Sequence, residues 1–427
     1  MLDRRFVREH PEVVRQMLAD RNNSLDLSAL LEKESERREL LTRCERLKAQ
    51  RNKSSEGIAV KKQRGENPDQ EISAMRAVSD EIKRLDNQLR EIDDAIDAYL
   101  LQIPNLPEAV VPRGKDASAN KEIRRWGEAP VFAFQPQPHW VIGERLGMLD
   151  EARATKISGA RFVIYRDTGA RLERAIIQFM LDMQREAGYL EVIPPLLVNR
   201  SAMIGTGQLP KLENDMFKTS DEEYFLIPTA EVPVTNMHRE EVIPAEQLPL
   251  RYVAYTPCFR KEAGSYGKDT QGIVRQHQFN KVELVKITTP DSSYQELENL
   301  VVDAERILHR LELHYRVVLL STGDMSFASA KSYDLEVWHS GVQRFWEVSS
   351  CSNFEAFQAR RMNMRFKDQE GKVQYCHTLN GSGLATSRLL PAIMECYQTE
   401  EGGMRIPTAL QPYLRGAKYI NPAGQLA

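Results

Sequence analysis

The feature that most constrains the fold is an apolar seam in the first quarter of the chain. Its members recur about every 3.5 residues, the period of a coiled coil. They are Ile72, Met75, Val78, Ile82, Leu85, Leu89, Ile92, Ile96, Tyr99 and Ile103. A weaker apolar run precedes the seam, from Leu27 towards Ile58, and Gly65 and Pro68 lie between the two. Because Gly and Pro favour a tight reversal, we expect an antiparallel helical hairpin over residues 27–64 and 69–103.

The composition of this first segment supports an elongated arm. Residues 1–103 hold 20 Lys+Arg and 21 Asp+Glu, about 40% of the segment, but only two of the 32 aromatic residues, Phe6 and Tyr99. A segment with so few large apolar side chains cannot build an ordinary globular core. At 1.5 Å per residue, its first long helix would reach roughly 55 Å.

Charge is separated between the two expected helices. Residues 43–64 carry a net charge of +6, and residues 69–103 carry −5. Two interpretations stay open: the helices pair through salt bridges, or the basic residues form a stripe that binds phosphates. The basic residues are Arg43, Arg46, Lys48, Arg51, Lys53, Lys61, Lys62 and Arg64.

The composition of the whole chain excludes several classes of protein. No stretch approaches 18 uninterrupted apolar residues, and the first residues lack the apolar core of a signal peptide, so no membrane association is expected. The five cysteines are far apart and form no CxxC pair. Neither a disulfide scaffold nor zinc is therefore expected, and a cytoplasmic location is the default.

The remaining chain has two parts. Residues 104–165 contain six prolines, which predict short strands and loops in a connecting segment. Residues 166–427 begin with a helical pattern and continue with strand-like runs that have few helices between them. This order favours an antiparallel sheet flanked by helices, and hence an α+β fold with three parts, 1–103, 104–165 and 166–427.

Two polar clusters lie at the ends of predicted strands. Thr229-Ala230-Glu231 follows an apolar run and suits the lip of a pocket. Residues 258–262 and 275–283 form two predicted strands joined by a long loop. Arginines suit phosphate groups and an aromatic ring can stack on a base. The residues so brought together are Arg260, Glu262, Arg275, Phe279 and Glu283.

Two further clusters follow. In residues 345–353, strand alternation places Glu347 and Ser349 on the face opposite Val348, and Glu347 with Ser350 could hold a hard cation such as Mg²⁺. In residues 377–388, a polar strand end leads into a helix with Arg388 one turn inside. Each cluster has a structural alternative, such as a cross-strand ion pair, a core phenylalanine or a structural histidine at position 277.

The order and spacing of these segments resemble motifs 1, 2 and 3 of the class II aminoacyl-tRNA synthetases, and in detail the seryl-tRNA synthetases of bacterial type. Pro195 stands as the motif 1 proline. The matching segments are residues 188–198, 205–210, 229–231, 259–262, 277–283, 347–354 and 380–385. The resemblance covers the whole chain, because this family carries an N-terminal antiparallel coiled coil.

The resemblance implies a serine–tRNA ligase. Such an enzyme activates serine with ATP to seryl-adenylate and pyrophosphate, and then transfers serine to the 3′ end of tRNA(Ser), commonly also of tRNA(Sec). The implied catalytic residues are Arg260, Glu283 and Arg388. The implied serine-binding residues are Thr229, Ala230, Glu231, Arg260, Glu283, Asn380 and Ser382. The implied ATP-binding residues are Arg260, Lys261, Glu262, Arg275, Gln276, Phe279, Glu347, Val348, Ser349, Ser350 and Arg388, with Glu347 and Ser350 as ligands of Mg²⁺.

The resemblance also implies a homodimer, in which the arm grips the long variable arm of the tRNA across the dimer. Two alternatives share some of these features. A related ligase that loads a carrier protein would lack the long basic arm, and an inactive tRNA-binding homologue would not keep Arg260, Glu262, Glu283, Glu347 and Arg388 intact.

Overall fold

The computed structural model describes residues 1–221, 223–263 and 271–427. It divides into two compact units. The first, here called the hairpin unit, comprises Leu2–Ala19 and Asn23–Ile103. The second, the sheet unit, comprises Met1, Asp20–Asn22 and Pro104–Ala427. Residues 264–270, in the predicted loop of the second cluster, lie outside the described residues. None of the described helices combines the length and apolarity needed to cross a membrane.

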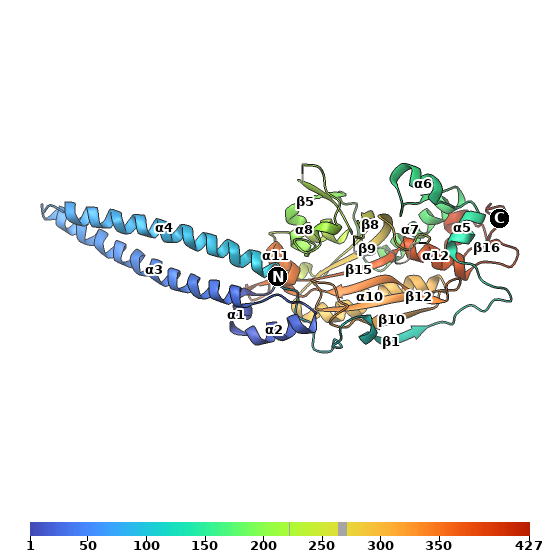
Figure 1. Cartoon of the computed structure of the whole chain (residues 1–427), viewed down its shortest axis with the longest axis horizontal. Helices are drawn as coiled ribbons and strands as arrows, with labels where there is room; N and C mark the ends of the chain where they lie inside the picture. Colours follow the sequence, from blue (N-terminus) through green and yellow to red (C-terminus); the bar gives the residue numbers. More distant parts are fainter. Residues whose placement is uncertain (222, 264–270) are drawn as a thin grey trace. The chain divides into compact units, whose positions relative to one another are not determined.

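The hairpin unit contains the expected antiparallel pair of long helices. Helices α3 (Ser28–Gln63) and α4 (Asp69–Leu100) run side by side, and they follow the short helices α1 (Arg4–Glu9) and α2 (Pro11–Asp20) (Figure 1). Gly65 adopts a φ of +73° in the turn between the long helices, a conformation open to glycine at little cost. The predicted hairpin is confirmed, with its ends within three residues of the expected positions.

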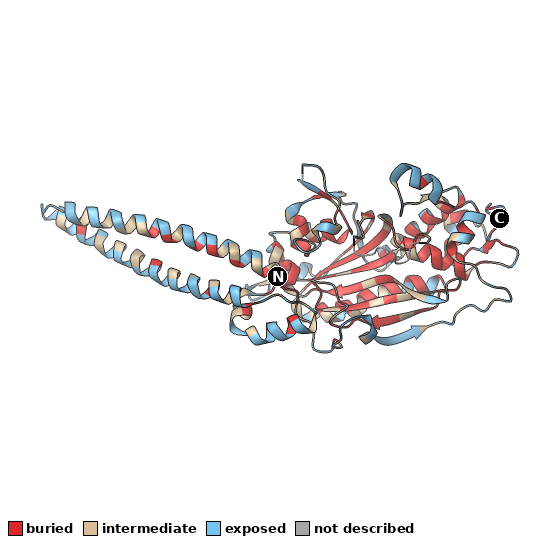
Figure 2. Cartoon of the chain, viewed as in Figure 1, coloured by how far each residue is buried: buried red, intermediate tan, exposed pale blue. Residues whose placement is uncertain are grey.

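The apolar seam forms the contact between the two long helices. Ile82, Leu85 and Leu89 of α4 are buried together with Cys44 of α3. Figure 2 shows buried positions along the hairpin with exposed positions around them. Nearer the turn, Ile72 and Met75 are only half-buried. The two helices therefore pack by their seam alone and leave their outer faces to solvent.

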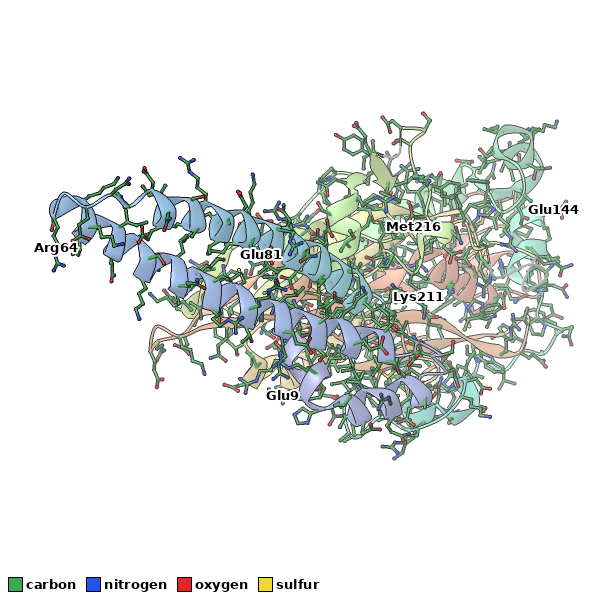
Figure 3. The ribbon with its side chains drawn as sticks, turned by 60° about the vertical axis from the view of Figure 1, so that its left-hand side comes forward. Glu9, Arg64, Glu81, Glu144, Lys211 and Met216 are labelled. Carbon is green, nitrogen blue, oxygen red and sulfur yellow. The ribbon has the colours of Figure 1, made fainter. Side chains whose placement is uncertain are left out.

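Ion pairs between α3 and α4 use only some of the basic residues. The pairs are Arg43–Glu81 at 2.6 Å, Lys48–Asp86 at 2.8 Å, and Lys61–Glu71. Figure 3 shows Arg64 at the turn and Glu81 along α4. Among the described residues, the other five basic residues take part in no ion pair: Arg46, Arg51, Lys53, Lys62 and Arg64. The basic stripe thus contains both helix-pairing and unpaired members.

The sheet unit is built on an eight-stranded sheet in the order β1-β10-β11-β12-β15-β9-β8-β4. All neighbours are antiparallel except β4 and β8, which are parallel. The strands are β1 (Lys121–Trp126), β4 (Leu190–Glu191), β8 (Leu250–Phe259), β9 (Gln278–Thr288), β10 (Tyr315–Leu319), β11 (Lys331–His339), β12 (Arg344–Asn353) and β15 (His377–Ala385). The predicted α+β fold is confirmed.

The two faces of the sheet have different roles. Val253, Val282 and Leu284 of the central strands enter the main core with helices α7 (Thr168–Glu186), α10 (Ser293–Arg310) and α12 (Thr386–Cys396). Glu283 lies between Val282 and Leu284 and pairs with Ala254 across β8 and β9. Because side chains alternate along a strand, Glu283 faces away from this core. The opposite face of the sheet is therefore where polar side chains of neighbouring strands can meet.

Residues 104–165 contain two short helices besides the expected strands and loops. Helix α5 (His139–Arg145) begins directly after Pro138, the last of the six prolines. Helix α6 (Glu151–Ser158) is capped by Asp150, whose side chain accepts from the backbone N–H of Arg153. The segment, which the structure describes in full, has no long helix, as the prolines predict, but the prediction of short strands and loops did not include α5 and α6, which lie beyond the last proline.

Smaller elements complete the sheet unit around this framework. They are β2 (Leu149–Asp150), β3 (Ile164–Tyr165), β5 (Leu197–Asn199), α8 (Arg200–Thr206), β6 (Tyr224–Leu226), α9 (Glu231–Asn236), β7 (Val242–Pro244), α11 (Ala356–Met362), β13 (Arg365–Lys367), β14 (Val373–Tyr375), β16 (Met404–Arg405) and β17 (Tyr419–Ile420).

Candidate active site

A cavity of about 250 Å³ opens on the polar face of the sheet. Its walls come from β9, β12 and β15, the residue after β8, the end of α8, the start of α9 and the loop at residues 326–328. Eight residues predicted from the sequence line it: Thr229, Glu231, Arg260, Glu283, Glu347, Ser350, Asn380 and Ser382. Segments far apart in the chain are therefore brought to one site by the order of the strands.

Glu283 is the centre of a buried network of polar side chains. Lys281 Nζ lies 2.6 Å from Glu283 Oε2 and donates to Thr229 Oγ1 at 2.9 Å. Asn380 Nδ2 donates to Glu283 Oε1 at 2.8 Å. Ser382 is directly opposite Glu283 in the register of β15 and β9. Because its partners lie on its own strand β9 and on the neighbouring strand β15, the carboxylate of Glu283 is held in one orientation.

Glu231 is a second buried carboxyl group in the same cavity. Its Oε1 accepts from Gln358 Nε2 at 2.7 Å, and its Oε2 lies 3.5 Å from Gln208 Nε2. Burial, and next the negative charge of Glu283, raise the pKa of Glu231 to about 7. The charge of this carboxyl group therefore changes in the neutral range of pH.

Arg260 follows the last residue of β8 and points its guanidinium over an aromatic ring. Arg260 Cζ lies 5.2 Å from the centroid of the Phe279 ring, and Nε donates to the carbonyl of Pro228 at 3.3 Å. The backbone of Arg260 is held by His277, whose carbonyl accepts the Arg260 N–H at 2.9 Å and whose Nδ1 lies 3.0 Å from the Arg260 carbonyl. His277 thus has a structural role here.

Arg388 and Glu347 form an ion pair at the edge of the cavity. Arg388 Nη1 lies 3.0 Å from Glu347 Oε2 and donates to the Glu347 carbonyl at 2.7 Å. Burial disfavours the charged form of Glu347, but the positive charges of Arg388, Arg260 and Lys281 together outweigh it and keep the pKa of Glu347 below its ordinary value. Arg275 and Glu262 form a similar pair at 3.0 Å.

The remaining predicted residues do not line the cavity itself. Ala230 is buried in a hydrophobic cluster, so only its backbone is available to a ligand. Lys261 Nζ lies 5.8 Å from the centroid of the Phe217 ring, and Gln276 is buried. The predicted residues outside the cavity lining are Ala230, Lys261, Glu262, Arg275, Gln276, Phe279, Val348, Ser349 and Arg388.

The alternation predicted along β12 is corrected by a bulge. Glu336 of β11 pairs with Glu347, whereas the adjacent Leu335 pairs with Ser349, so Val348 is the extra residue. Glu347 and Ser350 consequently share the cavity face although they are three residues apart. Ser349 does not share that face as predicted, because its hydroxyl donates to the Ser382 carbonyl at 2.6 Å on the buried side.

Several functional candidates were missed by the sequence prediction. Lys281 lies two residues before Glu283, and strand alternation could have placed it on the same face. Gln208 and Gln358, the partners of Glu231, carry no motif that points to them. Asp334 pairs with Ser350 across β11 and β12, and burial and the charge of Glu347 raise its pKa well above the ordinary value.

Comparison with known proteins assigns the family. Residues 1–107 match the seryl-tRNA synthetase N-terminal domain, and residues 213–397 match the tRNA synthetase class II core domain (G, H, P, S and T). The serine–tRNA ligase of Desulfitobacterium hafniense (strain DSM 10664 / DCB-2) is 56% identical over 98% of this chain and 100% of its own length. That of Geobacter sulfurreducens is 54% identical over 98% and 100%.

Solved structures agree with this assignment. The seryl-tRNA synthetase of Pyrococcus horikoshii, complexed with ATP, superposes with a TM-score of 0.94 at 39% identity, covering 99% of this chain and 100% of that one. The cytoplasmic enzyme of Naegleria fowleri, in complex with AMP, gives a TM-score of 0.89 at 27% identity, with 99% of each chain covered. The chain therefore belongs to the seryl-tRNA synthetases, the class II aminoacyl-tRNA synthetases that act as serine–tRNA ligases.

Proposed function

We propose that the cavity around Glu283 binds serine and activates it with ATP, the first step of the serine–tRNA ligase reaction. The observation that carries this proposal is the convergence of two buried carboxyl groups and a guanidinium on one cavity of about 250 Å³. A carboxyl group suits the ammonium of an amino acid, and a guanidinium suits its carboxylate. Serine, ATP and tRNA(Ser) are the substrates of the enzyme.

Glu231 and Glu283 bind the amino and hydroxyl groups of serine, with Thr229, Asn380 and Ser382 completing the pocket. A buried site that hydrogen-bonds the hydroxyl leaves polar groups unpaired when alanine binds, so it rejects alanine strongly. Threonine is excluded because its methyl group lacks room. The backbone at Ala230 contributes to the same wall.

The predicted residues outside the cavity lining, apart from Ala230, hold ATP together with Arg260, Glu347 and Ser350, which line the cavity. Phe279 stacks on the adenine and Glu262 receives its amino group, while Arg275 and Arg388 contact the phosphates. The other four residues of the ATP site contribute mainly through where they lie and through their backbone atoms: Lys261, Gln276, Val348 and Ser349. This assignment is supported by the ion pair of Arg388 with Glu347, which links the group to the cavity, and by the pair of Arg275 with Glu262 within the group.

Glu347 and Ser350 are the residues that would hold Mg²⁺. They fit a hard cation because both offer oxygen atoms and the bulge at Val348 brings them to the same face of β12. When bound, the ion neutralises charge on the triphosphate. Among the residues of this chain, Arg388 keeps Glu347 ionised and so keeps it ready to accept a cation.

The activation step needs positioning and charge rather than a base. A serine carboxylate oxygen forms a bond to the α-phosphorus while the bond from that phosphorus to the bridging oxygen breaks, and pyrophosphate leaves with the electron pair. Because the nucleophile is already ionised at neutral pH, no proton must be removed. Arg260 contacts both the carboxylate and the α-phosphate, so it stabilises the negative charge that develops between them. A terminal ribose hydroxyl of the tRNA then attacks the seryl carbonyl, and AMP leaves.

ATP–pyrophosphate exchange tests this proposal. Exchange measured with serine, threonine, alanine and glycine should be fastest with serine by at least about 100-fold. Exchange with none of the four amino acids would refute the proposed activation step. Equal exchange with serine and alanine would refute a pocket that hydrogen-bonds the serine hydroxyl.

The hairpin unit binds the tRNA through its unpaired basic residues. Substituting Arg46, Lys53, Lys62 and Arg64 with Ala should weaken tRNA(Ser) binding and lower the slope of log affinity against log salt by about one for each phosphate that the variant no longer binds. Substituting Arg43 and Lys48, which pair with α4, is the matched control and should change that slope less. Equal slopes for both variants would contradict a phosphate-binding stripe. Removing residues 27–103 should spare seryl-adenylate formation and abolish tRNA charging.

The enzyme acts as a homodimer in the cytoplasm, and tRNA(Sec) is a second tRNA substrate. The dimer is supported by exposed apolar side chains in and beside the segment that resembles motif 1. Leu190, Ile193 and Leu197 are 62%, 89% and 46% exposed within eight residues. A second copy of the chain would cover them, since clusters of exposed apolar residues usually mark an interface. The five buried free thiols suit a reducing compartment.

A further inference from the structure

A second buried polar cluster lies apart from the cavity and joins three elements of the sheet unit. It consists of His139 on α5, His339 on β11 and Glu395 on α12, all at most 1% exposed. His139 Nδ1 lies 2.7 Å from Glu395 Oε1, and the backbone N–H of His139 donates to the same oxygen at 2.9 Å. The other oxygen, Oε2, accepts from the backbone N–H of Gly341 at 2.8 Å. The two oxygens of the Glu395 carboxylate therefore accept hydrogen bonds from three donors.

Glu395 determines the tautomer of His139. Burial alone would raise the pKa of Glu395, but the hydrogen bond from His139 and the nearby ring of His339 lower it to about 2, so the group is ionised. An ionised carboxylate only accepts, which requires that His139 Nδ1 carries the proton. His139 Nε2 is then an acceptor, and it receives the backbone N–H of Ile273 at 3.1 Å.

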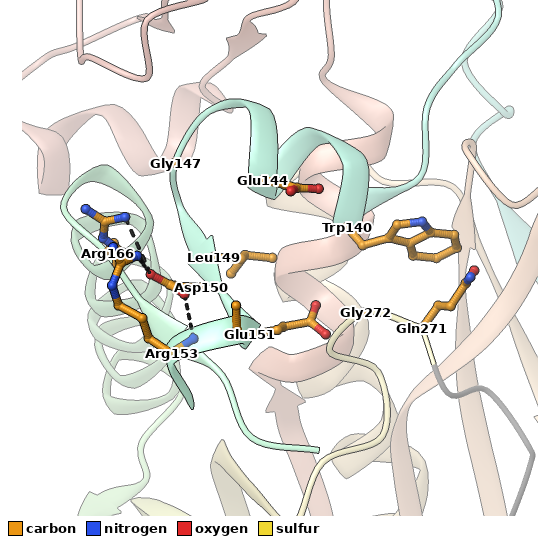
Figure 4. Close-up of a pocket in the computed structure, with 11 residues that line it drawn as sticks. Trp140, Glu144, Gly147, Leu149, Asp150, Glu151, Arg153, Arg166, Gln271 and Gly272 are labelled. Atoms are coloured by element: carbon orange, nitrogen blue, oxygen red, sulfur yellow. Dashed lines mark hydrogen bonds and ion pairs between the residues drawn. The ribbon is translucent and has the colours of Figure 1, made fainter. Parts of the chain in front are cut away.

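The contact with Ile273 requires a glycine next to it. A Cβ atom on Gly272 would lie 2.1 Å from His139 Nε2, and Gly272 has a φ of +74°. Figure 4 shows Gln271 and Gly272 beside Trp140, the neighbour of His139 on α5. The backbone of residues 271–273 is thus laid directly against α5.

The contacts of the cluster fit a chain of hydrogen bonds from Glu395 through His139 to Ile273, here called the relay, better than they fit a metal site. The three side chains place their ligand atoms within 4.8 Å of one another. Both ring nitrogens of His139 are already used, however, one by Glu395 and one by Ile273. His339 Nδ1 stands 3.8 Å from Glu395 Oε1. A shared ion would have to break the contact with Ile273, so the observed arrangement is one of hydrogen bonds.

The anchored segment leads directly into the proposed phosphate-binding residues. Val274 follows Ile273, is 4% exposed, and lies against Arg388, whose Nε is 3.5 Å from the Val274 carbonyl. The next residue, Arg275, pairs with Glu262 at 3.0 Å. Three consecutive residues therefore connect the His139 contact to both arginines that we assign to the phosphates of ATP.

We propose that Glu395 and His139 are positioning residues for ATP, which act through the backbone of Ile273 to place Arg275 and Arg388. This inference rests on the proposed function, because it deepens the ATP site described there. Neither residue lines the cavity around Glu283. Their loss should therefore affect ATP and leave serine binding in place.

Two isosteric variants of His139 test the relay in the full-length enzyme. The amide oxygen of His139→Gln can occupy the place of Nε2 and accept from Ile273. In His139→Asn the side chain is too short to do so, although it can still donate to Glu395. We expect His139→Asn to accelerate hydrogen exchange at the Ile273 amide and to raise the KM for ATP, each by about tenfold or more, with the KM for serine unchanged within about twofold. His139→Gln should stay close to the wild type in all three.

His339→Gln is the control for general loosening of the cluster, because His339 does not contact Ile273. It should lower the melting temperature without changing the KM for ATP. Unchanged hydrogen exchange at the Ile273 amide in His139→Asn would overturn the relay. An equal rise in the KM for ATP and in the KM for serine would overturn it as well. Faster exchange with an unchanged KM for ATP would overturn the link to ATP. All these outcomes differ from failure of the proposed function itself, in which the wild-type enzyme shows no exchange of pyrophosphate with serine.

Discussion

The raised pKa of Glu231 leads to a quantitative prediction about pH. If the ionised carboxylate binds the ammonium group of serine, then kcat/KM for serine follows the ionised fraction of the free enzyme. With a pKa of about 7, this fraction is about 0.9 at pH 8 and about 0.1 at pH 6. The pKa is raised, so the active form is present above pH 7 and is lost as the pH falls. We expect kcat/KM for serine to fall about tenfold from pH 8 to pH 6.

The variant Glu231→Gln separates this carboxyl group from others that titrate nearby. Glutamine keeps the size of the side chain but carries no charge at any pH. Loss of a charge-assisted hydrogen bond of about 1.5–3 kcal/mol lowers kcat/KM at pH 8 by roughly 10- to 100-fold. The variant should show a flat profile between pH 6 and pH 8, so its deficit relative to the wild type should shrink as the pH falls.

Serine-dependent pyrophosphate exchange at saturating ATP measures both profiles. The KM for ATP must be determined at each pH, because phosphate groups also titrate near pH 6. If Glu231→Gln keeps the tenfold decline of the wild type, the titrating group is another one. A flat wild-type profile would show that the environment of Glu231 does not raise its pKa as the structure indicates.

Three further predictions concern other sites. Glu283→Ala removes the partner of Lys281 and should lower serine-dependent exchange at least 100-fold while the Kd for ATP, measured by calorimetry, stays within twofold; unchanged exchange would remove Glu283 from the pocket. Ile193→Asp should convert the proposed dimer to a monomer in analytical ultracentrifugation, and an unchanged sedimentation coefficient would contradict the proposed interface. Lys286 is buried and lies 2.8 Å from Glu296 and 3.7 Å from Asp303, so Lys286→Met should lower the free energy of unfolding in urea by about 3 kcal/mol, because the two carboxylates lose a buried counter-charge; Arg251→Met, which leaves Glu296 its partner Lys286, should cost less because Arg251 is more exposed, and equal losses would contradict this reasoning.

Local patterns were sufficient to predict the hairpin and most of the sheet. The seam from Ile72 to Ile103 has a helical period that needs no knowledge of distant residues, and the observed helix α4 (Asp69–Leu100) follows it closely. The two strands predicted around the long loop, at residues 258–262 and 275–283, correspond to the end of β8 (Leu250–Phe259) and the first half of β9 (Gln278–Thr288). Helices and strands that are marked by periodic apolar residues within one segment were therefore predicted correctly from the sequence.

Contacts between distant segments could not be predicted in the same way. The bulge at Val348 depends on the register with β11, which the sequence of β12 alone does not contain. Gln358 reaches Glu231 across 127 positions from a helix that carries no motif. The link from Glu395 to Ile273 likewise needs three elements to be packed before it exists. Such residues lack a local signal because their role is created by tertiary structure.

The charges of the cavity show why local balance matters more than the chain's net charge of −3. Lys281 pairs with Glu283 at 2.6 Å, and Arg388 pairs with Glu347 at 3.0 Å. The two charges within each pair cancel. In the described part of the chain, the charged residues of the cavity that form no ion pair are then Glu231 and Arg260. One negative and one positive group in the lining of the same cavity match the ammonium and carboxylate of a single amino acid. If serine binds here as proposed, an analogue that lacked either charge would leave Glu231 or Arg260 without a counter-charge, so we expect the same arrangement to disfavour neutral analogues.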